Sequence, residues 1–313
     1  MRAAGGTRLR WDDVDPDVRA ALEAALGAAV VEARSEAGGF SPGLAARCRL
    51  ADGRRVFVKA VSPEQNPTAC RIHRREAEVA AQLPARVPAP RLLHVHDDGR
   101  WVALVFDEVA GRQPAEPWRW EDLDVVVPAL RRFADEATPT PVPGLQTVAE
   151  RYGAALDGWR RLAAGDGDPS PYGADVVALV DRLAELEAPW AEVAAGETLL
   201  HTDLRADNLL LTDDGDVVLV DWPWACNGAA FVDLVFLLPS VGLGQGPTPA
   251  AVVERYGLFA DVDPGALRSL VAALAGFFVR QSLDPAPPGL PTLRPFQRAQ
   301  AEVALGWLAP WVR

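Results

Sequence analysis

The densest group of chemically useful side chains lies between residues 201 and 221. The segment reads His201-Thr202-Asp203-Leu204-Arg205-Ala206-Asp207-Asn208, and Asp221 follows after a short apolar stretch. A carboxylate such as Asp203 can orient a hydroxyl group and accept its proton. The oxygens of Asn208 and Asp221 suit a hard cation such as Mg²⁺. These are the groups that phosphoryl transfer from ATP requires.

A second candidate stands out by composition. The chain has 30 arginines but a single lysine, Lys59. Strong use of arginine and alanine indicates a GC-rich genome, in which a lysine could survive where arginine cannot replace it. Lysine offers a compact point charge, whereas arginine offers a wide planar fork. Chance retention of Lys59 is the alternative.

The elements that must position these residues can be read from the pattern of apolar residues and turns. A helix is expected over 16–33, with Val18, Leu22, Leu26 and Val30 on one stripe. Strands are expected over 44–50 and 55–61, 91–96 and 101–106, and 209–211 and 217–220, each pair joined by a turn that contains Asp-Gly. Because a further helix over 67–83 separates the first two hairpins, this half reads as a small antiparallel sheet with a helix packed on it.

Beyond a Gly- and Pro-rich hinge, the chain reads as mostly helical. The expected helices cover 120–136, 147–164, 173–194, 229–240, 248–257, 264–283 and 294–311. The predicted organisation is therefore an N-terminal lobe over 1–107, a hinge over 108–117 and a helical C-terminal lobe over 118–313.

Composition and charge exclude several classes of protein. The net charge of −12 disfavours a nucleic-acid partner, and no apolar run is free of charge over the length of a membrane span. The first residues lack the apolar core of a signal peptide, so a cytoplasmic protein is expected. The three cysteines fit neither a disulfide framework nor a zinc site.

The negative charge is unevenly distributed. Residues 1–110 carry 16 basic and 15 acidic side chains, a net of +1, which leaves −13 for residues 111–313. The excess is either a solvated acidic surface or a region that binds metal ions and a cationic substrate.

The segment 201–208 resembles the kinase catalytic loop H-x-D-L-x-x-x-N, and Asp221 resembles the metal-binding aspartate that follows it. In place of the Phe-Gly pair of protein kinases, Asp221 is followed by Trp222-Pro223-Trp224-Ala225. This pattern is similar to that of the aminoglycoside phosphotransferase and choline-kinase-like superfamily. The resemblance runs from Gly38 to the C-terminal helices, and it implies an α+β, bilobal, protein-kinase-like fold.

The resemblance also implies roles for particular residues. Asp203 would be the catalytic base, Asn208 and Asp221 would bind Mg²⁺, and Lys59 would contact the α- and β-phosphates of ATP. Glu76, rather than Glu78, would pair with Lys59, and Asp233 would support the catalytic loop. The remaining nucleotide contacts would come from the hinge and the Gly-rich turn, that is from Phe106, Glu108, Val109, Gly39 and Ser41.

Other residues near the loop have two readings. Arg205 could stabilise the transferred phosphoryl group or could form a surface salt bridge. His201 is expected to be hydrogen-bonded inside the loop, and Asp207 to face solvent or cap the turn. Trp222 and Trp224 could line the acceptor pocket, although tryptophans more often belong to the core.

The predicted function is ATP- and Mg²⁺-dependent transfer of a phosphoryl group to a hydroxyl of a small molecule. The acidic C-terminal half favours a cationic acceptor, such as an aminoglycoside, a peptide antibiotic or an amino alcohol; a neutral sugar or nucleoside remains open. A nucleotide-binding pseudokinase is the alternative. No Ala-Pro-Glu motif follows Asp221 as in protein kinases, no G-x-G-x-x-G marks a Rossmann domain, and no membrane or obligate protein partner is expected.

Overall fold

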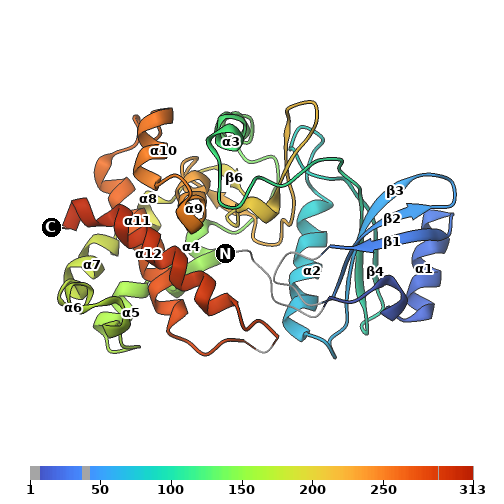
Figure 1. The fold of residues 1–313 in the computed structure, drawn as a ribbon, viewed down its shortest axis with the longest axis horizontal. Coiled ribbons are helices and arrows are strands. Elements are labelled where there is room, and N and C mark those ends of the chain that lie inside the picture. Colours follow the sequence, from blue (N-terminus) through green and yellow to red (C-terminus); the bar gives the residue numbers. More distant parts are fainter. Residues whose placement is uncertain (1–7, 37–42, 288, 313) are drawn as a thin grey trace.

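A computed structural model describes residues 8–36, 43–287 and 289–312 of the chain. The described residues up to Asp107 form a sheet with two helices, which we call the sheet region. The residues from Trp120 onward are mainly helical, and we call them the helical region. Figure 1 shows the sheet region (blue) at one end of the molecule and the helical region (green to red) at the other.

The sheet region has an antiparallel sheet in the order β1-β2-β3-β5-β4 among the described residues. Both predicted hairpins are present, and a further strand, β1, lies at the edge. The strands are β1 (Val30–Ser35), β2 (Leu44–Leu50), β3 (Arg55–Val61), β4 (Leu92–Asp97) and β5 (Val102–Asp107).

The two faces of this sheet are covered by different helices, α1 (Pro16–Leu26) and α2 (Pro67–Ala80). Side chains alternate between the faces of a strand. Ala103 and Val105 of β5 therefore join the core beneath α1, whereas Leu104 and Phe106 pack with α2. Lys59 of β3 lies on the α2 face, which is why it can reach that helix.

The predicted helix over 16–33 is wrong in its second half. The helix α1 ends at Leu26 because Gly27 adopts a left-handed conformation (φ 70°), and the chain then forms β1. The prediction failed because Val30 happens to continue the helical spacing of the apolar residues, although Gly27 has already ended the helix.

The helical region confirms the predicted helices 120–136, 248–257, 264–283 and 294–311 to within two residues. The predicted segments 147–164 and 173–194 are each broken into shorter helices, and the predicted helix 229–240 begins later. The observed helices are α3 (Trp120–Glu136), α4 (Val148–Tyr152), α5 (Gly158–Ala163), α6 (Ala174–Ala178), α7 (Val180–Glu187), α8 (Trp190–Val193), α9 (Val232–Val241), α10 (Pro249–Tyr256), α11 (Pro264–Ser282) and α12 (Leu293–Val312).

Two short hairpins frame the segment 201–208. The predicted pair β7 (Leu209–Leu211) and β8 (Val217–Leu219) follows it, and it returns the chain to Asp221. A second pair was not predicted: β6 (Thr198–Leu200) precedes the segment, and its partner β9 (Cys226–Gly228) follows Asp221.

The core of the helical region is built around α11, where residues 270–275 are all buried. Its neighbour α5 approaches unusually closely, because a Cβ on Gly158 would lie only 2.1 Å from the carbonyl oxygen of Gly276. The buried Trp159 donates a hydrogen bond from Nε1 to Ala272 O (2.8 Å). These contacts fix α11, which also forms one wall of the cavity described below. No helix among the described residues is long and apolar enough to cross a bilayer.

Candidate active site

A cavity of about 850 Å³ lies between the sheet region and the helical region. Its lining includes Lys59 and Glu76 from the sheet region and Asp203, Asn208 and Asp221 from the helical region. The structure therefore brings together the predicted charged residues from both halves of the chain around one space.

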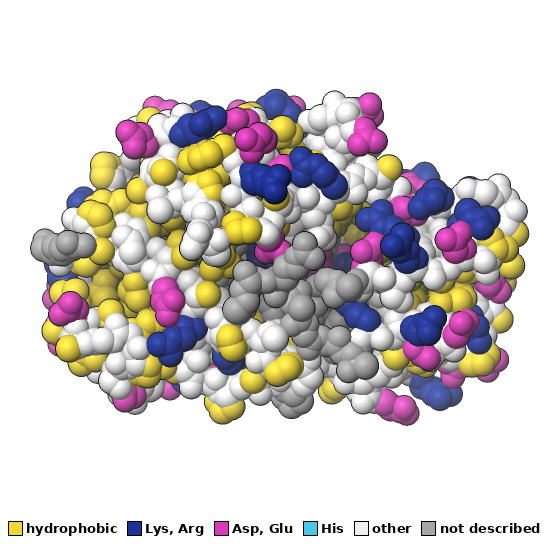
Figure 2. Space-filling model, in the orientation of Figure 1, with side chains coloured by type: hydrophobic (Ala, Val, Ile, Leu, Met, Phe, Trp, Pro, Cys, Tyr) yellow, Lys and Arg dark blue, Asp and Glu magenta, His cyan; other side chains and the backbone are white. Residues whose placement is uncertain are grey.

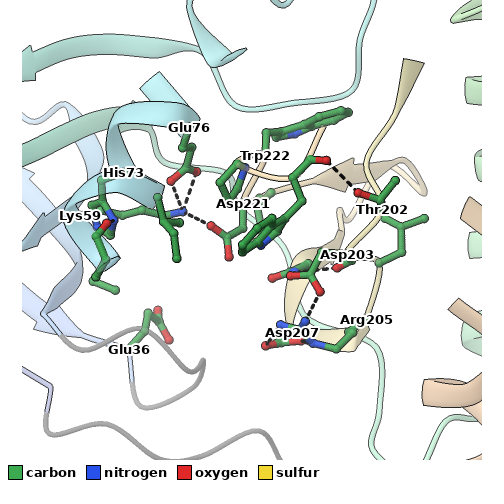
Figure 3. A pocket seen from close by; sticks show the side chains of 18 of the residues that line it. Glu36, Lys59, His73, Glu76, Thr202, Asp203, Arg205, Asp207, Asp221 and Trp222 are labelled. Atoms are coloured by element: carbon green, nitrogen blue, oxygen red, sulfur yellow. Dashed lines mark hydrogen bonds and ion pairs between the residues drawn. The ribbon is translucent and has the colours of Figure 1, made fainter. Parts of the chain in front are cut away.

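Lys59 joins the two regions. Its Nζ donates to Glu76 Oε1 and Oε2 at 2.6 and 2.8 Å, and to Asp221 Oδ1 at 2.8 Å. Figure 3 shows Asp221 between this pair and the group around Asp203. Glu78 forms an ion pair with Arg75 instead, at 3.8 Å. The structure thus selects Glu76 as the partner of Lys59.

The two carboxylates that share the Lys59 ammonium group have pKa values shifted in opposite directions. The pKa of Asp221 is lowered to about 2, since the charge of Lys59, its hydrogen bond and Arg205 together outweigh the opposing effect of burial. Burial is the largest influence on Glu76 and raises its pKa, although Lys59 opposes this. Burial likewise favours the neutral form of Lys59, but Asp221 and Glu76 overcome it and raise the pKa of the lysine. Asp221 therefore stays ionised at neutral pH.

The loop before β7 forms a second charged group. Arg205 Nη1 donates to Asp203 Oδ1, and its Nε and Nη2 bond the two carboxylate oxygens of Asp207 at 3.0 and 3.1 Å. Arg205 is thus an internal ion-pair partner, with only 16% of its side chain exposed. Asp207 does not point away into solvent as expected; it lines the cavity and holds Arg205 in place.

Asn208 orients Asp203 from the other side. Its Nδ2 donates to the Asp203 carbonyl oxygen (2.8 Å) and to Asp203 Oδ2 (3.1 Å). Because the amide nitrogen is used in this way, Asn208 Oδ1 is the end of the side chain left for another partner. Burial raises the pKa of Asp203 to about 7, despite the opposing charge of Arg205 and with a further contribution from Asp221. Asp203 is thus poised to exchange a proton near neutral pH.

The backbone of the segment 201–208 is supported by Asp233 of α9. The two oxygens of its carboxylate accept hydrogen bonds from the backbone N–H groups of His201 (2.8 Å) and Thr202 (2.7 Å). His201 is fully buried; its Nε2 bonds Val220 O (2.9 Å), and its Nδ1 accepts from the Asp203 N–H (3.3 Å). The expected supporting roles of Asp233 and His201 agree with this geometry.

The backbone is strained at two points beside the charged groups. Thr202 and Asp221 have φ values of 61° and 71°, in the left-handed region that non-glycine residues seldom occupy. Such conformations persist only where surrounding contacts enforce them, and they cluster at functional sites.

The predicted hinge also borders the cavity. The ring of Phe106 lies 5.8 Å from Lys59 Nζ, and Arg47 Nη1 donates to Glu108 Oε1 (3.1 Å) and to the Val109 carbonyl oxygen (3.2 Å). Among the described residues, the Val109 N–H and the Glu108 carbonyl have no hydrogen-bond partner. Gly39 and Ser41, the predicted contacts in the Gly-rich turn, lie outside the described residues.

The two tryptophans after Asp221 separate into the two expected environments. Trp222 is mainly a core residue, with 2% exposure and edge contacts to His201 and Phe133, although it also borders the cavity. Trp224 lines the cavity, and the guanidinium of Arg151 lies over its ring at 4.6 Å.

Sequence reasoning missed a wall of the cavity built by the last two helices. We call it the α11–α12 wall; it consists of Leu274, Phe277, Phe278 and Gln281 of α11 and Leu293, Phe296, Gln297 and Gln300 of α12. Arg8 was also missed; burial lowers its pKa, while the charges of Asp221 and Asp207 oppose this. No motif marks these residues, although the spacing i, i+3, i+4, i+7 on each helix is a signal of a shared face.

Comparisons with known proteins fit this geometry. The phosphotransferase enzyme family (APH) matches residues 38–270, whereas no curated protein matches the chain. A thermostable mutant of the aminoglycoside phosphotransferase APH(4)-Ia, in a ternary complex with ADP and hygromycin B, is similar with a TM-score of 0.58 and 17% identity, over 95% of this chain and 98% of that one. Choline kinase LicA from Streptococcus pneumoniae is similar with a TM-score of 0.58 and 14% identity, over 92% and 98%.

A third structure, aminoglycoside-3′-phosphotransferase of type VIII, is similar with a TM-score of 0.51 and 24% identity, over 84% of this chain and all of that one. At such identities a structural likeness shows the fold, and it confirms the predicted bilobal, kinase-like α+β fold. Because the family match covers more than half of the sequence and includes Lys59, Asp203, Asn208 and Asp221, the chain belongs to the phosphotransferase enzyme family.

Proposed function

We propose that this phosphotransferase moves the γ-phosphoryl group of ATP to a hydroxyl group of a small molecule. The observation that carries the proposal is the convergence of Lys59, Asp203, Asn208 and Asp221 on one cavity. The similar APH(4)-Ia structure holds a nucleotide, ADP, together with a small molecule, hygromycin B, which supports a cavity that takes a nucleotide and an acceptor at once.

The nucleotide would lie on the sheet side of the cavity. Lys59 would leave or share its carboxylate partners to contact the phosphates, and its compact ammonium suits this crowded position better than a guanidinium. The unpartnered Val109 N–H and Glu108 carbonyl offer the donor and acceptor that an adenine edge requires.

Asn208 Oδ1 and the carboxylate of Asp221 would hold Mg²⁺. A low pKa keeps Asp221 ionised, and the Asn208 amide nitrogen is already used, so both side chains present oxygen to the cavity. The described residues contain no cluster of three or more His, Cys, Asp or Glu arranged to hold a metal alone. This agrees with an ion that binds through one or two protein ligands together with nucleotide phosphates, whose charge it would neutralise.

Asp203 would act on the acceptor. The acceptor oxygen forms a bond to the γ-phosphorus, the bond from that phosphorus to the oxygen of ADP breaks, and the hydroxyl proton passes to the carboxylate of Asp203. Arg205, fixed by Asp203 and Asp207, places a positive charge beside the reacting groups, where it can stabilise developing negative charge.

The test is ATP turnover in the presence and absence of acceptors. The wild-type protein should hydrolyse ATP slowly with Mg²⁺ alone and transfer ³²P from γ-labelled ATP to compounds in a metabolite and antibiotic library. Asp203→Ala should slow both reactions about 1000-fold while ATP still binds. Asp213→Ala, an exposed carboxylate in the turn between β7 and β8, is the control.

One outcome would overturn the proposal. A wild-type protein that binds ATP but shows neither hydrolysis nor transfer that depends on Asp203 would be a nucleotide-binding protein without catalysis.

A further inference from the structure

The α11–α12 wall gives the acceptor end of the cavity an apolar character. Each helix contributes residues at i, i+3, i+4 and i+7, which lie on one face of a helix. On each helix the set begins with a leucine followed by a phenylalanine, and its last residue is a glutamine. The Phe278 and Phe296 side chains are largely buried, at 8% and 5% exposure. The wall is therefore a packed, preformed surface.

Aromatic contacts connect this wall to the catalytic loop. Tyr152 of α4 lies edge-on to Phe277 (6.5 Å between ring centres) and to Phe236 (5.7 Å). Its hydroxyl donates to the carbonyl oxygen of Thr202, the residue before Asp203 (3.1 Å). A molecule that rests on the wall would thus lie next to the group that we propose as the base.

The polar groups of the wall are neutral amides with a set orientation. Arg294 Nη1 donates to Gln281 Oε1 (3.1 Å) and to Gln297 Oε1 (2.8 Å). Because arginine can only donate, both glutamines must turn their oxygens toward it and keep their NH₂ groups for another partner. Gln300 is 4% exposed, and its side chain makes no hydrogen bond to any described residue. These amides suit a ligand that carries carbonyl, ether or hydroxyl oxygens.

Among the described residues, each carboxylate that lines the sheet side of the cavity already forms an ion pair. Glu36 pairs with Arg47 (2.5 Å), Asp107 pairs with Arg91 (3.0 Å), and Glu108 pairs with Arg47 and Arg55 (3.1 and 2.9 Å). As shown above, Glu76 pairs with Lys59.

The same holds on the helical side. Asp203 and Asp207 share Arg205, and Asp221 shares Lys59 with Glu76, so two cations hold four carboxylates at this end of the cavity. Among the described lining residues, no carboxylate belongs to α4, α9, α11 or α12, and the charged residue that α4 contributes is a cation, Arg151. The acidic excess of residues 111–313 lies elsewhere; on the face shown in Figure 2, acidic side chains are scattered over the surface.

We propose that the phosphate acceptor is a neutral, largely apolar alcohol that carries further ester, ketone, ether or amide oxygens. This inference rests on the proposed function, and it replaces the cationic acceptor that net charge favoured. The apolar skeleton would pack on the phenylalanines of the wall, its oxygens would accept from the glutamine NH₂ groups, and the reacting hydroxyl would face Asp203. An amine placed on the wall would lie near the positive charge of Arg151, and no carboxylate of a described lining residue on α4, α9, α11 or α12 would balance its charge.

The first experiment compares acceptor classes with the full-length protein and γ-labelled ATP. The neutral probes are hydroxysteroids and polyhydroxylated macrolactones, and the cationic probes are hygromycin B and choline. We expect kcat/KM at least about 100-fold higher for the best neutral probe, since a charged group on the wall would have no carboxylate partner there.

The second experiment changes the wall. Gln300→Glu introduces a carboxylate at nearly constant volume, and it should raise KM for the neutral probe about tenfold and lower KM for the cationic probes. Gln300→Leu should raise KM for the neutral probe and leave kcat nearly unchanged, which distinguishes a positioning role from a catalytic one. Gln146→Glu, an exposed residue outside the cavity, changes the net charge equally and is the control.

The outcomes separate the two proposals. Transfer to hygromycin B or choline with no transfer to any neutral probe, or a Gln300→Glu variant that behaves like Gln146→Glu, would overturn this inference and leave the proposed function intact. Slow ATP hydrolysis that depends on Asp203 reports the proposed function independently, and it also shows that each variant is folded.

Discussion

Two charged groups line the cavity, and each consists of one cation and two carboxylates, but they are assembled from different parts of the chain. Lys59 shares its charge between Glu76 and Asp221, and Arg205 shares its charge between Asp203 and Asp207. The lysine group joins residues 17 and 162 positions apart, whereas the arginine group spans two residues on either side. The first therefore exists only when the two regions are assembled, and the second is a property of one loop.

One carboxylate of each group, Asp221 and Asp203, has a pKa shifted in the direction that suits its proposed role. The pKa of Asp221 is lowered to about 2 and that of Asp203 is raised to about 7. Where environments drive neighbouring acids apart in this way, the low-pKa member suits charge binding and the high-pKa member suits proton transfer. The comparison teaches that the balance between burial and the neighbouring charges differs: burial prevails over Arg205 at Asp203, whereas Lys59 and Arg205 prevail over burial at Asp221.

The strongest way to break this comparison is to remove Asp203. Asp203→Ala should lower kcat about 1000-fold, since positioned proton transfer contributes roughly 10²–10⁴-fold, while ATP affinity stays close to wild type. Steady-state kinetics and equilibrium ATP binding measure the two effects. Unchanged turnover would remove Asp203 from its assigned role.

Exchange of the cation in the other group tests whether shape matters. Lys59→Arg retains the charge but widens the head group between Glu76 and Asp221, and we expect kcat/KM for ATP to fall about 100-fold, the size of a lost charged hydrogen bond. Arg49→Lys, the reverse exchange at an exposed position of β2, should leave kinetics unaltered. Equal activity of Lys59→Arg would show that charge alone suffices.

The support beneath the loop should matter less for rate than for stability. Asp233→Asn replaces one of two acceptor oxygens with a donor that faces a backbone N–H, and it should lower the free energy of unfolding by about 1–3 kcal/mol. Asp263→Asn, an exposed N-cap of α11 where asparagine serves equally well, is the control in chemical denaturation. Equal midpoints for the two variants would contradict the proposed support.

The smallest expected effect is on the pH dependence of ATP hydrolysis, which tests the raised pKa of Asp203. Asp203 must be ionised to accept a proton, so kcat/KM for Mg-ATP hydrolysis should rise with pH and level off above about 7. Arg205 lowers the pKa of Asp203 and Asp207 raises it. Arg205→Gln should therefore move the midpoint upward and Asp207→Asn downward; shifts in the same direction would refute this electrostatic account.

The kinase-like fold and the charged residues of the cavity could be predicted from sequence because they combine strong local signals with a motif. Asp52-Gly53 fixes one hairpin, and the order from His201 to Asn208 and Asp221 fixes the loop. The strand β1 was missed because Val30 continues the apolar stripe of α1 and the other residues of the strand are exposed. The strands β6 and β9 were missed because each has only three residues, too few to show an alternation of apolar and polar side chains.

The acceptor side was beyond the reach of pattern analysis for a different reason. Every residue of α11 from 269 to 276 is buried, so this part of its sequence shows no contrast between a core face and a cavity face. Net charge then pointed toward a cationic acceptor, but it counts carboxylates without their partners. Asp203 and Asp207 illustrate the difference, since both carboxylates already form ion pairs with Arg205.

The solitary lysine has a practical consequence for chemistry on this protein. Reagents that acylate or alkylate amines find a single ε-amino group in the whole chain, and that group is clamped at the junction of the two regions with 15% of its side chain exposed. The extent of its labelling thus gauges how often the junction opens, and a nucleotide that covers it should shield it. Mass spectrometry of the intact chain, with the N-terminal amine as internal reference, would measure the fraction of molecules labelled at Lys59 with and without nucleotide.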